Sequence, residues 1–387
     1  MLYTKQEILK RIQGSGFSLA HLSDHCPELQ ALKNIPQNPA YHGEGDVYSH
    51  TEMVCEELLS LHEWNTLSTA EQELLFLAAA FHDIGKTACT KQEDGKWISP
   101  KHTIVGEKIF RRMIYREADR FCLTFHQRET AAKLIRYHGL PVWFWTKTRP
   151  ESELLRAAES IPLRFLYLLS KADVKGRIAK DHGQLEEQVE LFADYAKELD
   201  IWEQPYTFAN PYTRFQYFHK EDLWHKATLY DDTEFDVIMM SGLPLAGKDS
   251  WIERCGTGEH GMKIPVISLD EIRRQYGIPP AKDTGKVAQI AIGQAKTFLR
   301  QKKPFIWNAT SIIQETRQRL VSLFAGYGAR VHIVYLEAPY QELLDRNQKR
   351  ERYIPEPVLE EMIRKLEPPA PWESFTVNNG LPFHICL

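Results

Sequence analysis

Apolar residues up to position 200 recur at steps of three and four, the spacing that places them on one face of a helix. Four segments carry the pattern most clearly: HTEMVCEELLSLHEW (50–64), AEQELLFLAAAFHD (70–83), ESIPLRFLYLLSKADVKGR (159–177) and QLEEQVELFADYAKEL (184–199). Strand-like alternation is scarce in this half. We therefore predict an all-α domain over residues 1–200.

The pattern then changes twice. The stretch DIWEQPYTFANPYTRFQYFHKEDLWHK (200–226) is rich in aromatic residues and proline and has no clear period. So many aromatic side chains disfavour a freely flexible linker, and we predict a packed connector over residues 201–234. From Phe235 onward, helix-like stretches alternate with short apolar runs, which are FDVIMM, IPVISL, PFIWNA and RVHIVYLE. This alternation predicts an α/β domain with a parallel sheet over residues 235–387.

Length and charge agree with two globular domains. The chain has 387 residues, more than one ordinary core, with 43% hydrophobic and 26% charged residues. A net charge of −4 argues against a protein that coats nucleic acid nonspecifically. An enzyme that acts on a strand end needs only a local basic pocket, so the net charge does not exclude it.

The cysteines and the N-terminus indicate the compartment. Six scattered cysteines form no CxxC motif, which favours reduced thiols over a zinc ribbon: Cys26, Cys55, Cys89, Cys122, Cys255 and Cys386. The charged start MLYTKQEILKRIQGSG lacks the apolar core of a signal peptide, and no apolar run approaches the length of a membrane span. We predict a cytoplasmic protein without membrane association.

The stretch MSGLPLAGKDSW (240–251) follows the apolar run FDVIMM and precedes a predicted helix. A glycine, four residues and then Gly-Lys are typical of a phosphate-binding loop in this context. Glycines let several backbone N–H groups point at phosphate oxygens, the helix N-terminus adds a favourable field, and the lysine reaches the β- and γ-phosphates. The predicted nucleotide-binding residues are Gly242, Leu243, Pro244, Leu245, Ala246, Gly247, Lys248, Asp249 and Ser250.

Asp249 departs from this loop pattern, which normally has Ser or Thr as the Mg²⁺ ligand after the lysine. A carboxylate can also bind Mg²⁺, directly or through water, but it adds negative charge beside phosphates. Ser250 has a hydroxyl, yet it lies one residue further on and points elsewhere on a helix. Either Asp249 replaces the hydroxyl at the metal, or the loop has lost its function.

Three downstream features favour a working site. Asp270 and Arg273 follow the second apolar run, where a carboxylate can accept a proton from a hydroxyl and an arginine can hold an acceptor phosphate. A plain helix N-terminal aspartate is the alternative. Asn308 ends the third run, as a weak metal neighbour or a structural amide. Arg346 and Arg350 have i, i+4 spacing, which predicts either a lid over the phosphates or a solvated charged helix.

Residues 235–365 resemble the polynucleotide 5′-kinase branch of the P-loop phosphotransferases. The resemblance rests on GLPLAGKD, on Asp270-x-x-Arg273 and on Arg346-x-x-x-Arg350. It implies ATP or another NTP with Mg²⁺ as the donor, and Asp270 as general base toward a 5′-hydroxyl. It further implies that Arg273 engages the acceptor end and that the lid arginines contact the nucleotide phosphates. Asp249 is the departure from the family pattern, and it puts the metal contact in doubt.

In the helical half, AAAFHDIGK places His82 and Asp83 side by side at the end of an apolar helix. Such groups are costly to bury without partners. Candidate partners along the chain are His50, His102, His138 and Asp173. Imidazole and carboxylate ligands from several helices can converge on one metal or two, which would activate water for phosphoester hydrolysis. We assign no role to His42, His62, His126, His182, His219 and His225.

This set resembles the HD phosphohydrolase superfamily over residues 40–180. The pattern H…HD…D corresponds to His50, His82-Asp83 and Asp173, which would form the primary shell of one or two divalent ions, expected to be transition metals. His102 and His138 resemble the extra histidines of members with a second metal or a phosphate-binding role. Lys86 and Arg177 are candidates for binding substrate phosphate, against plain surface charge.

An HD domain followed by such a kinase resembles the bacterial bifunctional HD-domain/polynucleotide-kinase end-healing enzymes. The resemblance implies that the HD domain removes 2′,3′-cyclic, 2′- or 3′-phosphate and that the kinase phosphorylates a 5′-hydroxyl of RNA or DNA, as in nucleic acid repair. The products suit a ligase, the implied functional partner. Two alternatives stay open: an HD nucleotidase fused to a small-molecule or nucleoside kinase, and a nucleotide-sensing protein whose sites bind without reacting.

Overall fold

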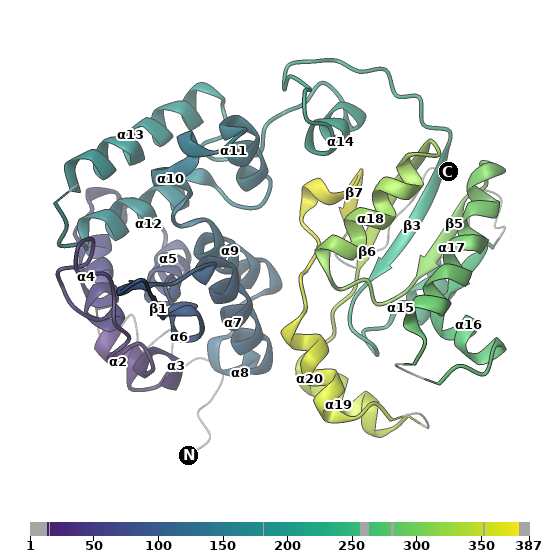
Figure 1. The fold of residues 1–387 in the computed structure, drawn as a ribbon, viewed down its shortest axis with the longest axis horizontal. Helices are drawn as coiled ribbons and strands as arrows, with labels where there is room; N and C mark the ends of the chain where they lie inside the picture. Colours follow the sequence, from purple (N-terminus) through teal and green to yellow (C-terminus); the bar gives the residue numbers. More distant parts are fainter. Residues whose placement is uncertain are drawn as a thin grey trace. The chain divides into compact units, whose positions relative to one another are not determined.

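The computed structural model describes residues 14, 16–180, 182–255, 263–279, 282–350 and 353–378, and the chain forms two compact units, Met1–Tyr206 and Thr207–Leu387 (Figure 1). Cys386 and most of the charged N-terminal stretch lie outside the described residues. No helix in the described part is long and apolar enough to cross a membrane.

The first unit is helical, as predicted. Its main helices and 3₁₀ turns are α2 (Leu19–Ser23), α3 (Pro27–Gln30), α4 (Val47–Ser60), η1 (His62–Thr66), α5 (Thr69–Phe81), α6 (Lys86–Cys89), α7 (His102–Arg116), α8 (Ala118–Phe121), α9 (Phe125–Tyr137), α10 (Leu140–Trp143), η2 (Phe144–Thr146), α11 (Pro150–Ala158), α12 (Leu163–Lys175) and α13 (His182–Glu198). One small hairpin interrupts the helices, with strands β1 (Lys91–Glu93) and β2 (Lys96–Ile98). Its turn residues Asp94 and Gly95 have φ of 48° and 73°, as a tight hairpin turn of the I′ type requires.

Helix α5 lies at the centre of this unit. Ser68 and Glu71 form a capping box at its start, which satisfies N–H groups that the helix itself leaves free. Every residue from Leu74 to Phe81 is buried, and α5 contacts α4, α9 and α12. A helix that is apolar on all sides belongs in a core. The C-terminal end of α5 therefore lies in the middle of the bundle, and His82 and Asp83 directly follow it there.

The second unit is built on a five-stranded parallel sheet in the order β4-β5-β3-β6-β7. The strands are β3 (Phe235–Ser241), β4 (Val266–Ser268), β5 (Phe305–Asn308), β6 (Ala329–Tyr335) and β7 (Thr376–Asn378). The first four lie in the predicted apolar runs, which confirms the parallel α/β fold. The short edge strand β7 was not predicted from the sequence.

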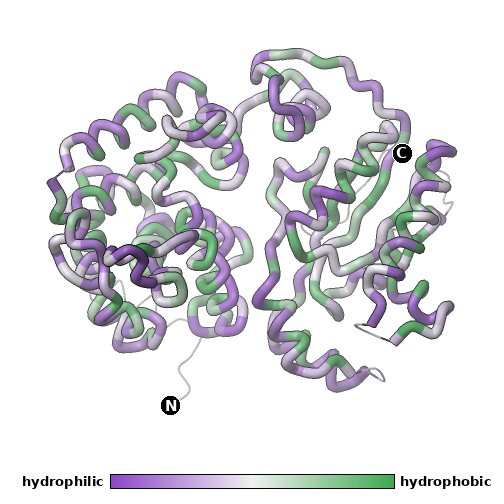
Figure 2. The backbone as a smooth tube through the Cα atoms, viewed as in Figure 1, coloured by the Kyte–Doolittle hydropathy of each residue, from purple (hydrophilic) through white to green (hydrophobic). Residues whose placement is uncertain are grey.

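Helices cover both faces of the sheet. The helices of this unit, with one 3₁₀ turn, are α14 (Pro211–His219), α15 (Lys248–Cys255), α16 (Leu269–Gln275), α17 (Thr284–Arg300), α18 (Gln314–Ala325), α19 (Tyr340–Gln348), α20 (Glu356–Arg364) and η4 (Pro371–Glu373). Residues of α17 and α18 share one core cluster with β3, and Trp251 of α15 packs in a second cluster with Ile238 and Met240. The helices alternate between hydrophobic and hydrophilic positions, as helices with one buried face do (Figure 2).

The aromatic segment after residue 200 contains a helix that its sequence did not reveal. Helix α14 begins at Pro211, after the N-cap Asn210, whose side chain accepts a hydrogen bond from the Thr213 amide. Phe215 of this helix packs against Phe375 with ring centroids 5.1 Å apart. The segment from Thr207 onward belongs to the second unit.

Candidate metal centre and phosphate-binding loop

Six residues from five regions of the helical unit converge at one point. His50 lies in α4, His82 and Asp83 directly follow α5, His102 begins α7, His138 follows α9, and Asp173 lies in the last turn of α12. All are buried except His102, whose side chain is 25% exposed. The residues predicted from the sequence as metal ligands are thus gathered in one cluster.

Backbone carbonyls orient three of the histidines. The Nδ1 atoms of His82, His102 and His138 each lie within 2.7–2.9 Å of the carbonyl oxygen three residues earlier. A carbonyl can only accept, so Nδ1 donates in each ring, and in the neutral ring the lone pair is then on Nε2. Hydrogen bonds of this kind fix the tautomer and orientation of metal-binding imidazoles. The three Nε2 atoms are therefore ready to bind a cation.

One group of ligand atoms surrounds the end of α5. His50 Nε2 and His82 Nε2 lie 3.4 Å apart, and Asp83 Oδ2 lies 3.4 Å from His82 Nε2 and 3.8 Å from His50 Nε2. Asp173 Oδ1 lies 3.1 Å from His50 Nε2 and 3.9 Å from His82 Nε2. Imidazoles mixed with carboxylates suit divalent transition metals.

A second group uses the other oxygen of Asp83. Asp83 Oδ1 lies 3.3 Å from His102 Nε2 and 3.9 Å from His138 Nε2, and these three side chains could hold an ion of their own. Within the described residues this buried oxygen has no hydrogen-bond partner. Since a buried carboxylate oxygen without a partner is costly, the site fits a cation there. Asp83 is shared by both groups.

Protonation also favours metal binding. Burial lowers the pKa of His138 to about 3, so its imidazole is neutral near pH 7. Burial opposes the charge on Asp83, but Lys86 and His82 hold the pKa of this carboxyl well below its ordinary value. Arg177 acts in the same way on the pKa of Asp173. Both carboxylates are therefore ionised, as metal ligands must be.

His42, to which the sequence analysis assigned no role, belongs to this site. Glu44 Oε1 lies 2.8 Å from Nδ1 of His42 and 3.0 Å from Nδ1 of His50, so one carboxylate orients both rings. Carboxylates in this position raise the basicity of the imidazole that they hold. The sequence offered one signal for these residues, the His-x-Glu spacing of His42 and Glu44 shortly before His50. Only the fold shows that the loop with His42 and Glu44 lies against α4.

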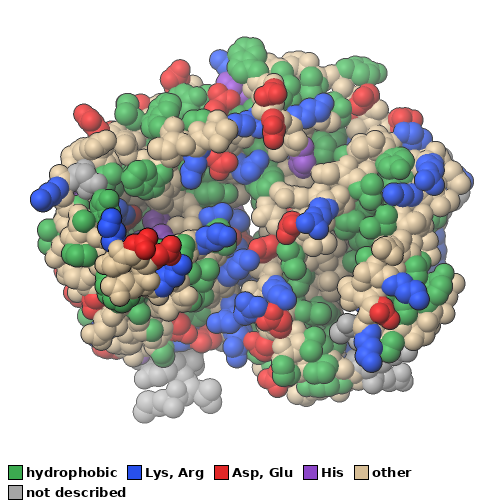
Figure 3. All heavy atoms as spheres, viewed as in Figure 1, with side chains coloured by type: hydrophobic (Ala, Val, Ile, Leu, Met, Phe, Trp, Pro, Cys, Tyr) green, Lys and Arg blue, Asp and Glu red, His purple; other side chains and the backbone are tan. Residues whose placement is uncertain are grey.

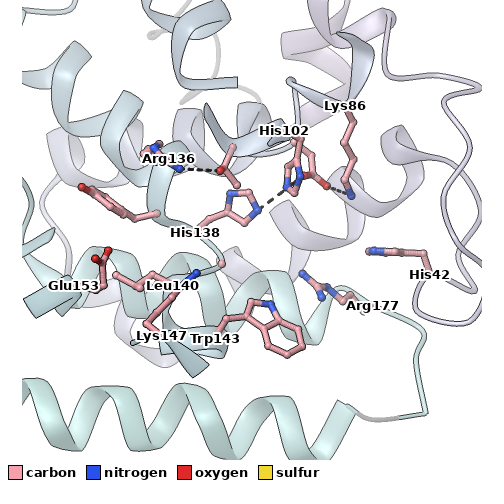
Figure 4. A pocket seen from close by; sticks show the side chains of 14 residues that line it. His42, Lys86, His102, Arg136, His138, Leu140, Trp143, Lys147, Glu153 and Arg177 are labelled. Atoms are coloured by element: carbon pink, nitrogen blue, oxygen red, sulfur yellow. Dashed lines mark hydrogen bonds and ion pairs between the residues drawn. The ribbon is translucent and has the colours of Figure 1, made fainter. Parts of the chain in front are cut away.

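The cluster opens into a cavity of about 410 Å³ (Figure 4). Lys86 and Arg177, expected as phosphate-binding candidates, lie in its wall and are tied to the metal cluster. Lys86 Nζ contacts Asp83 Oδ2 at 2.6 Å, and Arg177 Nη2 contacts Asp173 Oδ2 at 2.5 Å. Both cations therefore lie in the cavity wall, paired with carboxylates of the cluster. In Figure 3, histidine side chains are visible in a hollow of the helical unit, with Lys and Arg side chains near them.

The outer wall of this cavity carries cationic and aromatic side chains together with one carboxylate, Glu153 (Figure 4). Arg136 and Tyr137 come from the end of α9, Trp143 from α10, and Lys147 from the loop after η2. Trp143 is 50% exposed. Neither α10 nor this loop carries a recognisable motif, so the sequence analysis did not find these residues.

In the second unit, the predicted loop joins β3 to α15. Gly242 has φ of 143°, and a Cβ there would meet the Leu336 carbonyl oxygen at 2.2 Å, so only glycine fits. Gly247 has φ of 99° and also favours glycine. Lys248 Nζ donates to the carbonyls of Gly242 and Leu243 at 3.0 and 2.8 Å. The lysine thus folds back over the loop in this structure.

Charged residues predicted from the sequence surround Lys248. Desolvation lowers the pKa of Lys248 to about 8, the charges of Asp249 and Asp270 oppose this shift, and Arg350 adds to it. Arg346 Nη1 donates to the Leu245 carbonyl at 2.6 Å, which brings the predicted lid helix α19 to the loop. These interactions place the four residues around the loop lysine.

Arg273 and Asp249 have contacts that the sequence did not indicate. Arg273 Nη1 donates to the carbonyls of Pro279 and Lys282 at 3.0 and 2.7 Å, so it tethers the loop before α17. Asp249 Oδ1 accepts a hydrogen bond from Asn308 Nδ2 at 2.8 Å. Asp249, which departs from the expected phosphate-loop pattern, therefore contacts Asn308, the residue that ends β5.

Two parts of the chain match known domain families. Residues 47–170 match the HD domain, and residues 237–369 match the AAA domain. The chain therefore consists of a helical HD domain followed by a P-loop domain with a parallel sheet.

Several curated proteins called multifunctional CCA proteins are similar to parts of this chain. The protein of Vibrio campbellii is 27% identical over 189 residues, which cover 49% of this chain and 39% of that protein. The protein of Methylococcus capsulatus is 35% identical over 114 residues, covering 30% and 24%. That of Hahella chejuensis is 41% identical over 81 residues, covering 21% and 16%. The chain thus spans less than half the length of these relatives.

Proposed function

We propose that this chain is a nucleic acid end-healing enzyme. The HD domain hydrolyses 2′,3′-cyclic, 2′- or 3′-terminal phosphates, and the P-loop domain transfers the γ-phosphate of an NTP to the 5′-hydroxyl of RNA or DNA. The observation that carries the proposal is the HD cavity, which joins a metal-binding cluster to a wall with Arg136, Lys147 and Trp143. Cations and an exposed indole suit the phosphate and base of a strand terminus, which needs no sequence readout.

The residues of the HD site divide into metal ligands and residues that bind the substrate. His50, His82, Asp83 and Asp173 would hold the first divalent ion, and His102 and His138 would hold a second together with Asp83. When bound, such ions supply an activated water and polarise the phosphoryl oxygen. The chain itself binds and orients the strand end: Lys86 and Arg177 neutralise the scissile phosphate, and the outer cations contact the phosphate before it.

In the P-loop domain, the backbone N–H groups of residues 242–250 other than Pro244, which has none, cradle the donor phosphates, and Lys248 neutralises them. Asp270 accepts the proton of the 5′-hydroxyl, Arg273 engages the acceptor end, and Arg346 and Arg350 contact the donor phosphates. Lys248 and Arg346 exchange their present carbonyl partners for phosphate oxygens on NTP binding.

The remaining parts of the proposal concern organisation and partners. The functional units comprise residues 1–200 and 235–387, joined by the connector 201–234. The enzyme acts in the cytoplasm with Mg²⁺ and an NTP at the kinase and transition metals at the HD site. Its products carry a 5′-phosphate and a free 3′ end, the ends that a nucleic acid ligase joins.

The test uses two labelled substrates. Transfer of γ-phosphate label from ATP to a 5′-hydroxyl oligonucleotide, and loss of terminal phosphate from an oligonucleotide with a 2′,3′-cyclic end, are the expected results. Both reactions require added divalent metal. If no label reaches any oligonucleotide while a free nucleoside becomes phosphorylated, the end-healing proposal is wrong.

One observation favours a second candidate function. A cavity of about 410 Å³ also has room for a mononucleotide, as an HD nucleotidase fused to a nucleoside kinase would need. The same pair of assays separates the two functions, because only the nucleotidase would prefer a free nucleoside monophosphate over an oligonucleotide end.

A further inference from the structure

Asp249 and Asn308 form a pair that neither residue suggests alone. Asp249 is the second residue of α15 and directly follows the loop lysine, and Asn308 is the last residue of β5. β5 pairs with β3, the strand that leads into the loop, so the two residues face each other across 59 positions of sequence. Asn308 is 8% exposed, whereas Asp249 is exposed.

The hydrogen bond fixes the chemistry of the pair. An ionised carboxylate can only accept, so Asn308 must present its NH₂ group to Asp249 Oδ1 at 2.8 Å. The other carboxylate oxygen, Oδ2, has no hydrogen bond within the described residues. The pair therefore offers one anionic oxygen beside the loop and a neutral amide that orients it.

The pair has the same two kinds of group as a common P-loop Mg²⁺ site, one carboxylate and one neutral polar group, but at exchanged positions. P-loop proteins commonly hold Mg²⁺ with a neutral hydroxyl after the loop lysine and a carboxylate on another strand. Here the carboxylate follows the lysine and the neutral group ends the strand, so the pair keeps one negative charge. Decay of the loop gives no reason for both positions to change together and remain hydrogen-bonded.

We propose that Asp249 and Asn308 are the Mg²⁺-binding unit of the donor nucleotide, with the carboxylate moved from the strand end to the loop. Asp249 supplies the charge, and Asn308 orients it. The inference rests on the proposed NTP-binding function of the loop, but it does not depend on which acceptor receives the phosphate.

The test is a four-protein cycle read by binding instead of turnover. Wild type, Asp249→Ser, Asn308→Asp and the double variant are titrated with a fluorescent, non-hydrolysable ATP analogue, with Mg²⁺ and with EDTA. In the wild type Mg²⁺ tightens binding, and Asp249→Ser weakens this Mg²⁺ effect by about tenfold or more. Asn308→Asp alone places two carboxylates together, so it also weakens binding.

The double variant restores the common arrangement of hydroxyl and carboxylate. We expect it to recover most of the Mg²⁺ effect, more than either single variant. Asp249→Asn, which keeps the shape but not the charge, loses the effect while thermal unfolding stays unchanged. Glu253→Gln removes a charge from the same helix outside the loop and serves as the control, with the full Mg²⁺ effect.

Two results would overturn the inference. One is a full Mg²⁺ effect on nucleotide binding in Asp249→Ser. The other is a double variant whose Mg²⁺ effect is no larger than that of the single variants. These failures are distinct from failure of the end-healing proposal. A protein that passes this cycle but phosphorylates no oligonucleotide keeps the metal pair and loses the proposed acceptor.

Discussion

At the residue scale, Asp83 is the side chain on which both ligand groups depend. One oxygen lies with His82 and His50, and the other lies with His102 and His138. No other described residue belongs to both of these groups. The backbone holds it firmly, because it follows the fully buried end of α5.

We predict that Asp83→Ala loses metal from both groups, whereas His102→Ala loses it from one. Phosphoesterase activity in Asp83→Ala falls by more than about 100-fold, since a buried ligand has no substitute. Metal bound per chain, measured by elemental mass spectrometry, checks the first statement directly. Retention of the wild-type metal content in Asp83→Ala would show that the ions bind elsewhere.

Trp143 tests whether the cavity takes a nucleic acid end. Stacking of a base on an exposed aromatic ring contributes about 1–3 kcal/mol, so Trp143→Ala should raise KM for an oligonucleotide end by about tenfold. Hydrolysis of a small phosphodiester without a base should stay unchanged. Trp145→Ala is the matched control, because Trp145 is 49% exposed but does not line the cavity. Equal effects of the two substitutions on KM would contradict a stacking role for Trp143.

At the element scale, buried ion pairs hold α7 against α9. His102 is the first residue of α7, and His138 directly follows α9. Glu107 Oε1 of α7 contacts Arg111 Nη2 at 2.6 Å and Lys133 Nζ of α9 at 2.8 Å. Burial opposes the charge on Glu107, but Lys133 and Arg111 lower the pKa of this carboxyl to about 2. The network therefore fixes the spacing of the second ligand group.

We predict that Glu107→Gln lowers the free energy of unfolding by about 3 kcal/mol at pH 7, because it leaves buried cations underpaired. The folded pKa of Glu107 lies below the unfolded value, so its contribution is complete above about pH 4.5 and is lost as the pH falls toward 2. Urea unfolding of both proteins should show a difference that narrows below pH 4.5. Glu56→Gln, on the exposed side of α4, is the control. A difference that stays constant with pH would exclude this ionisation as the cause.

The sequence was sufficient to predict the elements in which an apolar segment and a motif are adjacent in the chain. The buried run before His82-Asp83 and the strand before Gly242 each combine an apolar segment with a motif, so both sites could be located from the sequence. His42, Glu44 and Trp143 could not, because short helices and loops bring them to the site and no periodicity marks them.

The Asp249–Asn308 contact shows the other limit of the sequence. From the sequence, Asp249 was a departure from the loop pattern and Asn308 a weak metal neighbour or a structural amide, and the two lie 59 positions apart. Only the order of strands, with β5 beside β3, makes them neighbours. Arg273 holds the loop before α17 through a hydrogen bond to the Lys282 carbonyl. This contact could not be predicted from the sequence either, because it depends on the fold and not on a motif.

At the scale of the whole molecule, the chain joins two units with separate cores and separate sites. The HD cluster draws its residues from 42–177, and the phosphate loop draws its contacts from 242–350. Because the two sites share no residue in the described part of the chain, we predict that the two activities separate by mutation. Lys248→Ala should lose kinase activity by more than about 100-fold and keep phosphoesterase activity, measured on separate single-ended oligonucleotides. Loss of both activities in a folded Lys248→Ala protein would argue against independent sites.

The most direct test of end healing uses one oligonucleotide that carries a 5′-hydroxyl and a 2′,3′-cyclic phosphate, incubated with ATP and divalent metal and followed by mass spectrometry. We predict that the wild type adds one phosphate at the 5′ end and removes or opens the 3′-terminal phosphate. Asp83→Ala should change only the 5′ end, and Lys248→Ala only the 3′ end. An oligonucleotide that leaves the wild-type reaction with both ends unchanged, while free nucleotides are consumed, would contradict the account.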